Sequence, residues 1–292
     1  MKRRLKTGMG RYAPIFLLPT GIAFFIGFVW PFAMGIYLSL CKFVTADNAT
    51  FIGFSNYIKA FRDPAFRYSF GYTALFTVVS VIVINVLAFA IAYALTRKIR
   101  GRNIFRCVFF MPNLIGGIVL GYIWSMIFDA VLRGYGTYLL AKAPYGFIGL
   151  LILMSWQQIG YMMIIYIAGL QSVPESYLEA ARIDGASGWQ ILRRVIIPNV
   201  MPSITICTFL TLTNSFKLFD QNLALTGGMP VVMENGVAVN TTEMLALNIY
   251  KTFYTGVGGR GVAQAKAVIF FILVAVIALL QLSATRKKEV QQ

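Results

Sequence analysis

The sequence contains no histidine, and only ten of its 292 residues are acidic. A catalytic triad with a histidine base and a zinc site with histidine ligands are therefore excluded by composition. The ten carboxylates are scattered along the chain. We expect the chain not to be an enzyme in its own right and to bind no metal or cofactor itself.

Charged residues of either sign are also scarce, at 12% of the chain against 58% hydrophobic residues. One soluble core does not need so much apolar surface. Lys, Arg, Asp and Glu are absent from six windows of about 19 residues or more, each long enough to cross a hydrocarbon core of ~30 Å as a helix. The windows are Tyr12–Cys41, Tyr68–Thr96, Cys107–Phe128, Ala143–Pro174, Val195–Phe216 and Ala267–Thr285.

The six windows predict an all-α membrane protein with six transmembrane helices, in a single transmembrane domain that covers residues 1–292. Pro14, Pro19, Pro31 and Pro112 lie inside or near the ends of these windows. We expect the spans to stay helical there, because neighbouring helices satisfy the freed backbone groups. The three cysteines fall in or at the end of three different windows, which suits apolar packing better than disulfides.

The net charge of +16 reports orientation in a membrane rather than a nucleic-acid surface. If the N-terminus is inside, cytoplasmic segments hold 16 of the 26 Lys and Arg residues. The positive-inside rule then places both termini in the cytoplasm, and we expect a lipid bilayer and no nucleic acid as partner. The 16 residues are Lys2, Arg3, Arg4, Lys6, Arg11, Arg97, Lys98, Arg100, Arg102, Arg106, Arg182, Arg193, Arg194, Arg286, Lys287 and Lys288.

The segment Ser172–Pro202, between the fourth and fifth windows, carries helix-capping signals. Ser172 and Glu175 have capping-box spacing, which predicts a helix from about Pro174 to Ile183. Gly185 then suits a left-handed helix cap, directly after Asp184.

A second capping box, Ser187 with Gln190, predicts a second helix through about Ile197, where Pro198 disturbs it. The pattern therefore indicates a helix, a tight turn and another helix on the cytoplasmic face. Taken alone, it is also compatible with an amphipathic hairpin that simply lies on the bilayer.

The residues of this hairpin resemble the EAA loop of permease subunits of binding-protein-dependent ABC importers. Glu179-Ala180-Ala181, three residues, Gly185, nine residues and 195–198 (VIIP) match the pattern E-A-A, three residues, G, nine residues, I-x-L-P, with Val for Ile and Ile for Leu. Segments 51–57, 63–66, 109–113, 219–220 and 225–230 are similar to the six-span carbohydrate branch, except that Met229 stands where a third Gly is usual.

The resemblance implies a permease of the bacterial cytoplasmic membrane that imports a sugar or oligosaccharide. Its expected partners are a second permease, two ATPase subunits, which would hold the ATP and magnesium, and an extracytoplasmic solute-binding protein. The hairpin would dock in a cleft of the ATPase. The residues expected to couple it are Glu179, Ala180, Ala181, Asp184 and Gly185.

Neutral polar residues inside the windows are candidates for the solute pathway, because amides, hydroxyls and aromatic faces suit a sugar. The same residue types also join helices to one another in membrane bundles, so both readings stay open. The candidates are Gln157, Gln158 and Tyr161 in the fourth window, Thr211, Asn214 and Ser215 in the fifth, and Asn85 and Asn113 in the second and third.

Two other classes of transporter are alternatives. A stand-alone secondary transporter would normally show coupling carboxylates deep in its spans, and none of the windows contains one. A fused ABC exporter half would carry the phosphate-binding motif G-x-x-x-x-G-K-[ST], which the sequence lacks. Within the importer class, glycerol phosphate or another non-sugar solute remains an alternative.

Overall fold

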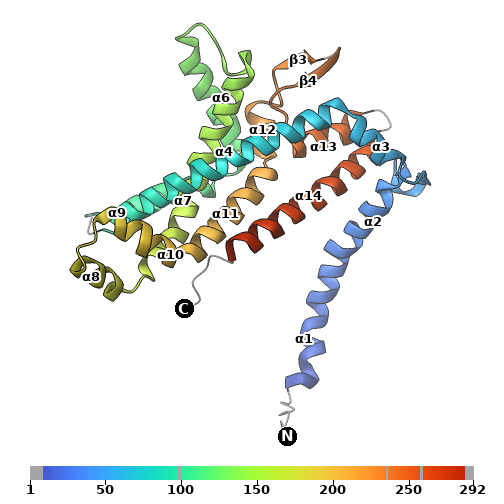
Figure 1. The fold of residues 1–292 in the computed structure, drawn as a ribbon. Coiled ribbons are helices and arrows are strands. Elements are labelled where there is room, and N and C mark those ends of the chain that lie inside the picture. Colours follow the sequence, from blue (N-terminus) through green and yellow to red (C-terminus); the bar gives the residue numbers. More distant parts are fainter. Residues whose placement is uncertain (1–8, 98–99, 235, 257–258, 287–292) are drawn as a thin grey trace. The chain divides into compact units, whose positions relative to one another are not determined.

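The computed structural model in Figure 1 is mostly helical and describes residues 9–97, 100–234, 236–256 and 259–286. The described residues belong to two compact units. One unit comprises residues 1–60 and 251–269, and the other comprises residues 61–250 and 270–292. Helices α3 (Ser55–Arg62), α13 (Leu245–Tyr254) and α14 (Arg260–Arg286) contain residues of both units.

The first unit begins with a long apolar helical segment that ends in a small hairpin. Residues Ile15–Ser39 are apolar and long enough to cross a membrane. The elements are α1 (Met9–Phe24), the π-helical η1 (Phe25–Val29), α2 (Trp30–Ser39), β1 (Cys41–Lys42), the 3₁₀ turn η2 (Ala46–Asn48) and β2 (Thr50–Phe51).

Asn56 fixes the chain where α2 ends, because its side-chain amide donates to the carbonyls of Ser39 at 2.9 Å and Cys41 at 2.8 Å. Gly261 allows this close approach, since a Cβ at that position would lie 2.3 Å from the Cys41 carbonyl oxygen. The first unit is therefore tied together by backbone groups as well as by apolar contacts.

The second unit holds the remaining helices and a second hairpin. Its elements are α4 (Pro64–Leu95), α5 (Arg102–Phe110), η3 (Met111–Leu114), α6 (Gly117–Arg133), η4 (Leu139–Ala141), α7 (Ala143–Gln171), α8 (Glu175–Ile183), α9 (Gly188–Ile191), η5 (Leu192–Ile196), α10 (Ile197–Asn199), α11 (Met201–Phe216), α12 (Asp220–Leu225), β3 (Val231–Glu234) and β4 (Val237–Asn240).

The core of the second unit lies where α7 packs against α4 and α11. Phe76, Ile84, Leu153 and Met162 are fully buried there. Close packing of helices in a membrane favours small residues at the contact. Gly121 of α6 meets α12 in this way, because a Cβ on it would lie 2.5 Å from the Ala224 Cβ.

Four described helices can each cross a membrane on their own: Ile15–Ser39, Pro64–Leu95, Ala143–Gln171 and Arg260–Ala284. They overlap four of the six predicted windows, although the last helix begins at Arg260, seven residues before its window. The other two windows form bent pairs of helices, Arg102–Leu114 with Gly117–Arg133 at 102° and Gly188–Asn199 with Met201–Phe216 at 71°. The number of spans is six if each bent pair is counted as one.

The expectation that the spans stay helical through their prolines is wrong at Pro112 in the third window, and the fifth window is bent as well. Pro112 lies in the 3₁₀ turn η3 and has no N–H to donate to the carbonyl four residues before it. Pro202 lies in the first turn of α11, directly after the bend at Val200. In both windows the helix changes direction at the proline-containing segment.

The prediction of an all-helical chain also needs a correction, because two antiparallel hairpins are present. Strands β1 and β2 pair Cys41 with Phe51, and strands β3 and β4 pair Val231 with Asn240. Strands of two and four residues are too short to give a clear alternating pattern in the sequence.

The predicted orientation stays a prediction. Lys2, Arg3, Arg4, Lys6, Lys98, Lys287 and Lys288 lie outside the described residues, and so do the side chains of Arg11 and Arg286.

Candidate functional site

Helix α8 of the predicted hairpin begins at Glu175, as the sequence indicates, but it is capped differently. Pro174 is the N-cap residue and makes no side-chain cap bond. Ser172 instead ends α7, where its hydroxyl donates to the carbonyl of Gly169 at 2.8 Å. The predicted capping box is therefore wrong, because Ser172 still belongs to the last turn of the preceding helix.

The turn after α8 agrees with the sequence. The Asp184 N–H donates to the carbonyl of Ala180 at 2.9 Å and ends the helix. Gly185 has φ +76°, the left-handed conformation that favours glycine. The Ala186 N–H then returns to the carbonyl of Ala181 at 2.9 Å. The turn therefore closes with helix-capping backbone bonds.

The second capping box is confirmed. The Gln190 N–H donates to the Ser187 hydroxyl at 3.3 Å, and the Ser187 N–H donates to the Gln190 side chain at 2.7 Å. The helical path continues through the π-helical turn η5 to Asn199, two residues beyond the predicted end. Pro198 lies in the first turn of α10 and does not end the helix.

The hairpin exposes most of the residues that the sequence singled out. Glu179, Ala180, Asp184 and Gly185 are exposed, and Ala181 is half-buried.

Three large apolar side chains of the hairpin are exposed as well: Ile183 at 86%, Trp189 at 67% and Tyr177 at 53%. Sequence reasoning gave no role to Trp189 or Tyr177. The available signal was their size, since large apolar residues are unusual on the open side of a short polar hairpin. An exposed group of this kind marks a surface that another molecule or a membrane covers.

Three candidate pathway residues instead join helices in the core. The Asn85 amide of α4 donates to the Thr211 hydroxyl of α11 at 3.3 Å, and the Tyr166 hydroxyl of α7 donates to Asn85 at 2.7 Å. The Ser215 hydroxyl donates to the Met154 sulfur of α7 at 3.8 Å, and Ser215 and Thr211 are both fully buried. Tyr166, which the sequence reasoning missed, completes the link between α4, α7 and α11.

Gln157 connects α7 to the bend before α6. Its amide donates to the Ile115 carbonyl at 3.0 Å and accepts from Gln221 of α12 at 2.6 Å. Its side chain is 6% exposed. This bond satisfies a backbone carbonyl that the broken helix leaves free, so Gln157 supports the bend.

Gln158 and Asn214 are the candidates that the structure brings together at a partly open position. The Asn214 amide donates to the Gln158 oxygen at 3.3 Å, and both residues are half-buried. Tyr161 and Asn113 are also half-buried. The polar candidates therefore separate into a buried group that joins helices and a partly open group.

Comparison with known proteins identifies the class of protein to which this fold and hairpin belong. Residues 100–288 match the family described as "Binding-protein-dependent transport system inner membrane component". The chain belongs to this family. It is an integral membrane permease component of a transport system, and its function class is transport rather than catalysis.

Two curated relatives cover nearly the whole chain. The "Probable starch degradation products transport system permease protein AmyD" of Thermoanaerobacterium thermosulfurigenes is 43% identical over 95% of this chain and 94% of its own length. The "Multiple sugar-binding transport system permease protein MsmF" of Streptococcus mutans is 31% identical over 94% of this chain and 95% of its own.

The fold is also that of a solved transporter subunit. A chain from the crystal structure of a bacterial ABC transporter involved in the import of the acidic polysaccharide alginate superposes with a TM-score of 0.79. The match covers 98% of this chain and 99% of that chain, at 20% sequence identity. The arrangement of helices is therefore shared, while the solute is not decided by this likeness.

Proposed function

We propose that the chain is one of two permease subunits in an ATP-driven importer that takes up a sugar or oligosaccharide from an extracytoplasmic binding protein. Two separate ATPase subunits bind ATP and magnesium, and this chain holds no cofactor. The chain is a single transmembrane domain in the bacterial cytoplasmic membrane, with both termini in the cytoplasm.

The names of the two relatives support a sugar as the solute, since one is a permease for starch degradation products and the other belongs to a multiple-sugar system. The observation that carries the proposal is the pair Gln158 and Asn214, which is polar, uncharged and half-buried. Amides can exchange their mutual bond for bonds to sugar hydroxyls at little cost, because one hydrogen bond replaces another.

Glycerol phosphate fits this position less well. A phosphate group binds most strongly to arginine, lysine or a helix N-terminus. The partly open candidates Gln158, Tyr161, Asn214 and Asn113 carry no charge. A neutral oligosaccharide is therefore the better match to these side chains.

The exposed hairpin supports the docking of an ATPase subunit. Ala180 and Gly185 leave room for close approach, Glu179 offers an acceptor, and Ile183 supplies apolar area. Closure of the ATPase pair would then move the hairpin as a rigid body together with the helices that follow it.

Uptake assays on the assembled transporter test the solute. We expect maltose or longer products of starch to be taken up by proteoliposomes that contain both permeases, the ATPases and the cognate binding protein. Unlabelled starch products should compete, and glycerol 3-phosphate should not. Uptake of glycerol 3-phosphate, with no uptake of any glycan in a panel of neutral oligosaccharides, would contradict the sugar proposal.

A further inference from the structure

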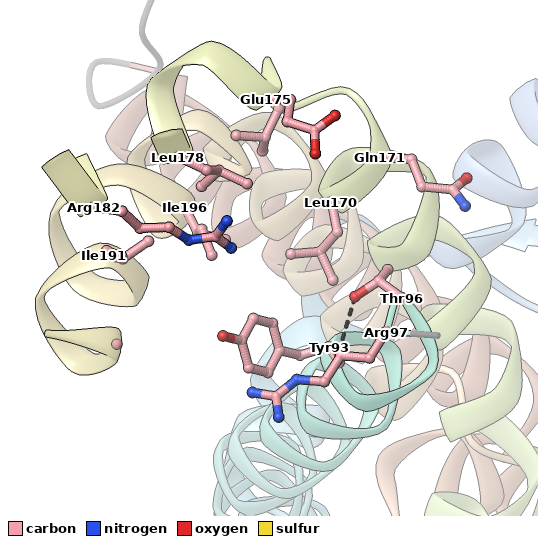
Figure 2. Close-up of a pocket in the computed structure, with 12 residues that line it drawn as sticks. Tyr93, Thr96, Arg97, Leu170, Gln171, Glu175, Leu178, Arg182, Ile191 and Ile196 are labelled. Atoms are coloured by element: carbon pink, nitrogen blue, oxygen red, sulfur yellow. Dashed lines mark hydrogen bonds between the residues drawn. The ribbon is translucent and has the colours of Figure 1, made fainter. Parts of the chain in front are cut away.

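A pocket of about 700 Å³ lies behind the hairpin, in the second unit. Figure 2 shows its walls, which come from the end of α4, the end of α7 and the inner side of α8 and η5. Its residues differ from the exposed hairpin residues that we assign to ATPase docking. The lining residues used below are Tyr93, Arg97, Leu170, Glu175, Leu178 and Arg182.

The pocket has two arginines on different walls. Arg97 follows the end of α4, and Arg182 lies in the last turn of α8. The Arg97 guanidinium lies 5.1 Å from the centre of the Tyr93 ring. Within the described part of the chain, neither arginine forms an ion pair, so their N–H groups are available to an anion. A planar guanidinium recognises phosphate oxygens through paired hydrogen bonds.

The rest of the lining is mostly apolar. Leu170 lies in the last turn of α7, Leu178 lies in the middle of α8, and both are half-buried. Ile191 and Ile196 of the second helical segment continue this surface. The pocket therefore offers a cationic part and an apolar part side by side, which suits an amphiphile better than a small hydrophilic ion.

The pocket lies where two membrane-crossing helices end. Helix α4 ends at Leu95 and α7 at Gln171, and both are long enough to span a bilayer. Arg100, Arg102 and Arg106 follow α4 closely in the sequence. If the hairpin faces the cytoplasm, as the proposed function requires, this is the level of the lipid headgroups on the side where anionic lipids attract basic residues.

We propose that this pocket binds the phosphate group of an anionic phospholipid. Arg97 and Arg182 hold the phosphate from two sides, and the glycerol and upper acyl chain lie along Leu170 and Leu178. Because Arg97 belongs to the end of α4 and Arg182 to the hairpin, the lipid joins these two elements. The lipid therefore stabilises the position of the hairpin.

Thermal-shift titration of the purified, fully assembled transporter tests this site, with phosphatidylglycerol and phosphatidylcholine of the same acyl chains as probes. Each of Arg97→Gln and Arg182→Gln should raise the half-maximal phosphatidylglycerol concentration about fivefold, from the effect of one basic residue near an anionic lipid. The double variant should raise it further than either single variant, without strict additivity, because both arginines contact the same phosphate.

Three controls make the test specific to the pocket. Arg194→Gln removes an exposed arginine of the same hairpin that does not line the pocket, and it should leave the titration unchanged. Glu175→Gln removes a carboxylate from the lining and should lower the half-maximal concentration. Arg182→Lys keeps the charge but loses the paired N–H groups, so its half-maximal concentration should lie between those of the wild type and Arg182→Gln.

Equal titration midpoints in the wild type and the double Arg97, Arg182 variant would overturn the proposal. If inorganic phosphate gave the same stabilisation with the same dependence on both arginines, the ligand would be a free phosphate rather than a lipid. The titration needs no transport, so its failure is separate from failure of the proposed function, which the uptake assay measures.

Discussion

At the scale of single residues, the polar side chains of the predicted spans fall into two groups. Some are partly exposed, and others are buried and form hydrogen bonds between helices. Gln158 and Asn214 bond to each other at a half-buried position, whereas Thr211 and Ser215 are fully buried. Mutation of a polar residue should therefore have different effects at the two kinds of position. At a half-buried position water or a solute can replace the lost hydrogen bond, and at a fully buried position neither can.

Gln158→Ala and Asn214→Ala should each lower uptake severalfold with little change in thermal stability, because water can satisfy the remaining partner. Thr211→Ala should instead lower the free energy of unfolding by about 1 kcal/mol, since it removes a buried hydroxyl that bonds Asn85. Uptake and melting temperature of the three variants check this separation. Normal uptake in the Gln158, Asn214 double variant would place both residues among the packing contacts.

Gly185→Ala should weaken the attachment of the ATPase subunits, because alanine at φ +76° costs about 1–2 kcal/mol of strain and shifts the turn. Gly101→Ala is the matched control. It introduces the same strain at φ +77°, also with no atom of the described residues within 4 Å of the new Cβ, but outside the hairpin. Co-purification of the ATPase subunits should fall for Gly185→Ala only, and an equal fall for both variants would argue for a general folding defect.

At the scale of elements, mutations at close helix contacts should change stability, and mutations on the exposed face of the hairpin should change assembly. Helix α7 meets α5 at Gly160, where a Cβ would lie 1.8 Å from the Phe109 carbonyl oxygen. Among the described residues, no atom lies within 4 Å of the position that a Cβ would take on Gly71 of α4, so Gly71 provides a contrast within another long helix.

Gly160→Ala should therefore destabilise the protein by about 1–3 kcal/mol through overpacking, because backbone rather than a flexible side chain must move. Gly71→Ala should be neutral or stabilising by up to about 1 kcal/mol, from helix propensity alone. Thermal unfolding in detergent compares the two. Equal melting temperatures would show that α5 can move away from α7 without cost.

The exposed apolar face of the hairpin should be needed for assembly and not for folding. Ile183→Ser and Trp189→Ser remove side chains that are 86% and 67% exposed, so the isolated permease should keep its melting temperature. Attachment of the ATPase subunits should fall in both variants. If attachment stays normal but the permease binds less tightly to lipid vesicles, the hairpin lies on the bilayer instead.

Much of the helical pattern could be predicted from the sequence, because exclusion of charge from windows such as Tyr68–Thr96 follows directly from the cost of charge in lipid. Gly185 and the Ser187 capping box could also be predicted, because turn and capping signals depend on residues that are close together in the sequence. The bends at Pro112 and Val200 could not, because whether a membrane helix tolerates proline depends on its neighbours.

The candidate site was predicted unevenly. The hairpin depends on local capping and turn signals, and the sequence carries these. The division of polar residues into buried links and partly open positions depends on which helices meet. Tyr166 and Gln221 show this, since their partners Asn85 and Gln157 lie 81 and 64 residues away in the sequence.

At the scale of the whole molecule, the proposed function makes the chain one part of a transporter whose specificity rests mainly with the delivering protein. The partly open pathway candidates Gln158, Tyr161, Asn214 and Asn113 are neutral amides and a hydroxyl, which bind a sugar weakly in competition with water. Free sugar alone should therefore do little to the assembled transporter.

The most direct test is the ATPase activity of proteoliposomes that contain both permeases and the ATPase subunits. Hydrolysis should rise strongly only when the cognate binding protein and its sugar are both present on the side opposite the hairpin. Full stimulation and uptake with free sugar and no binding protein would contradict the account.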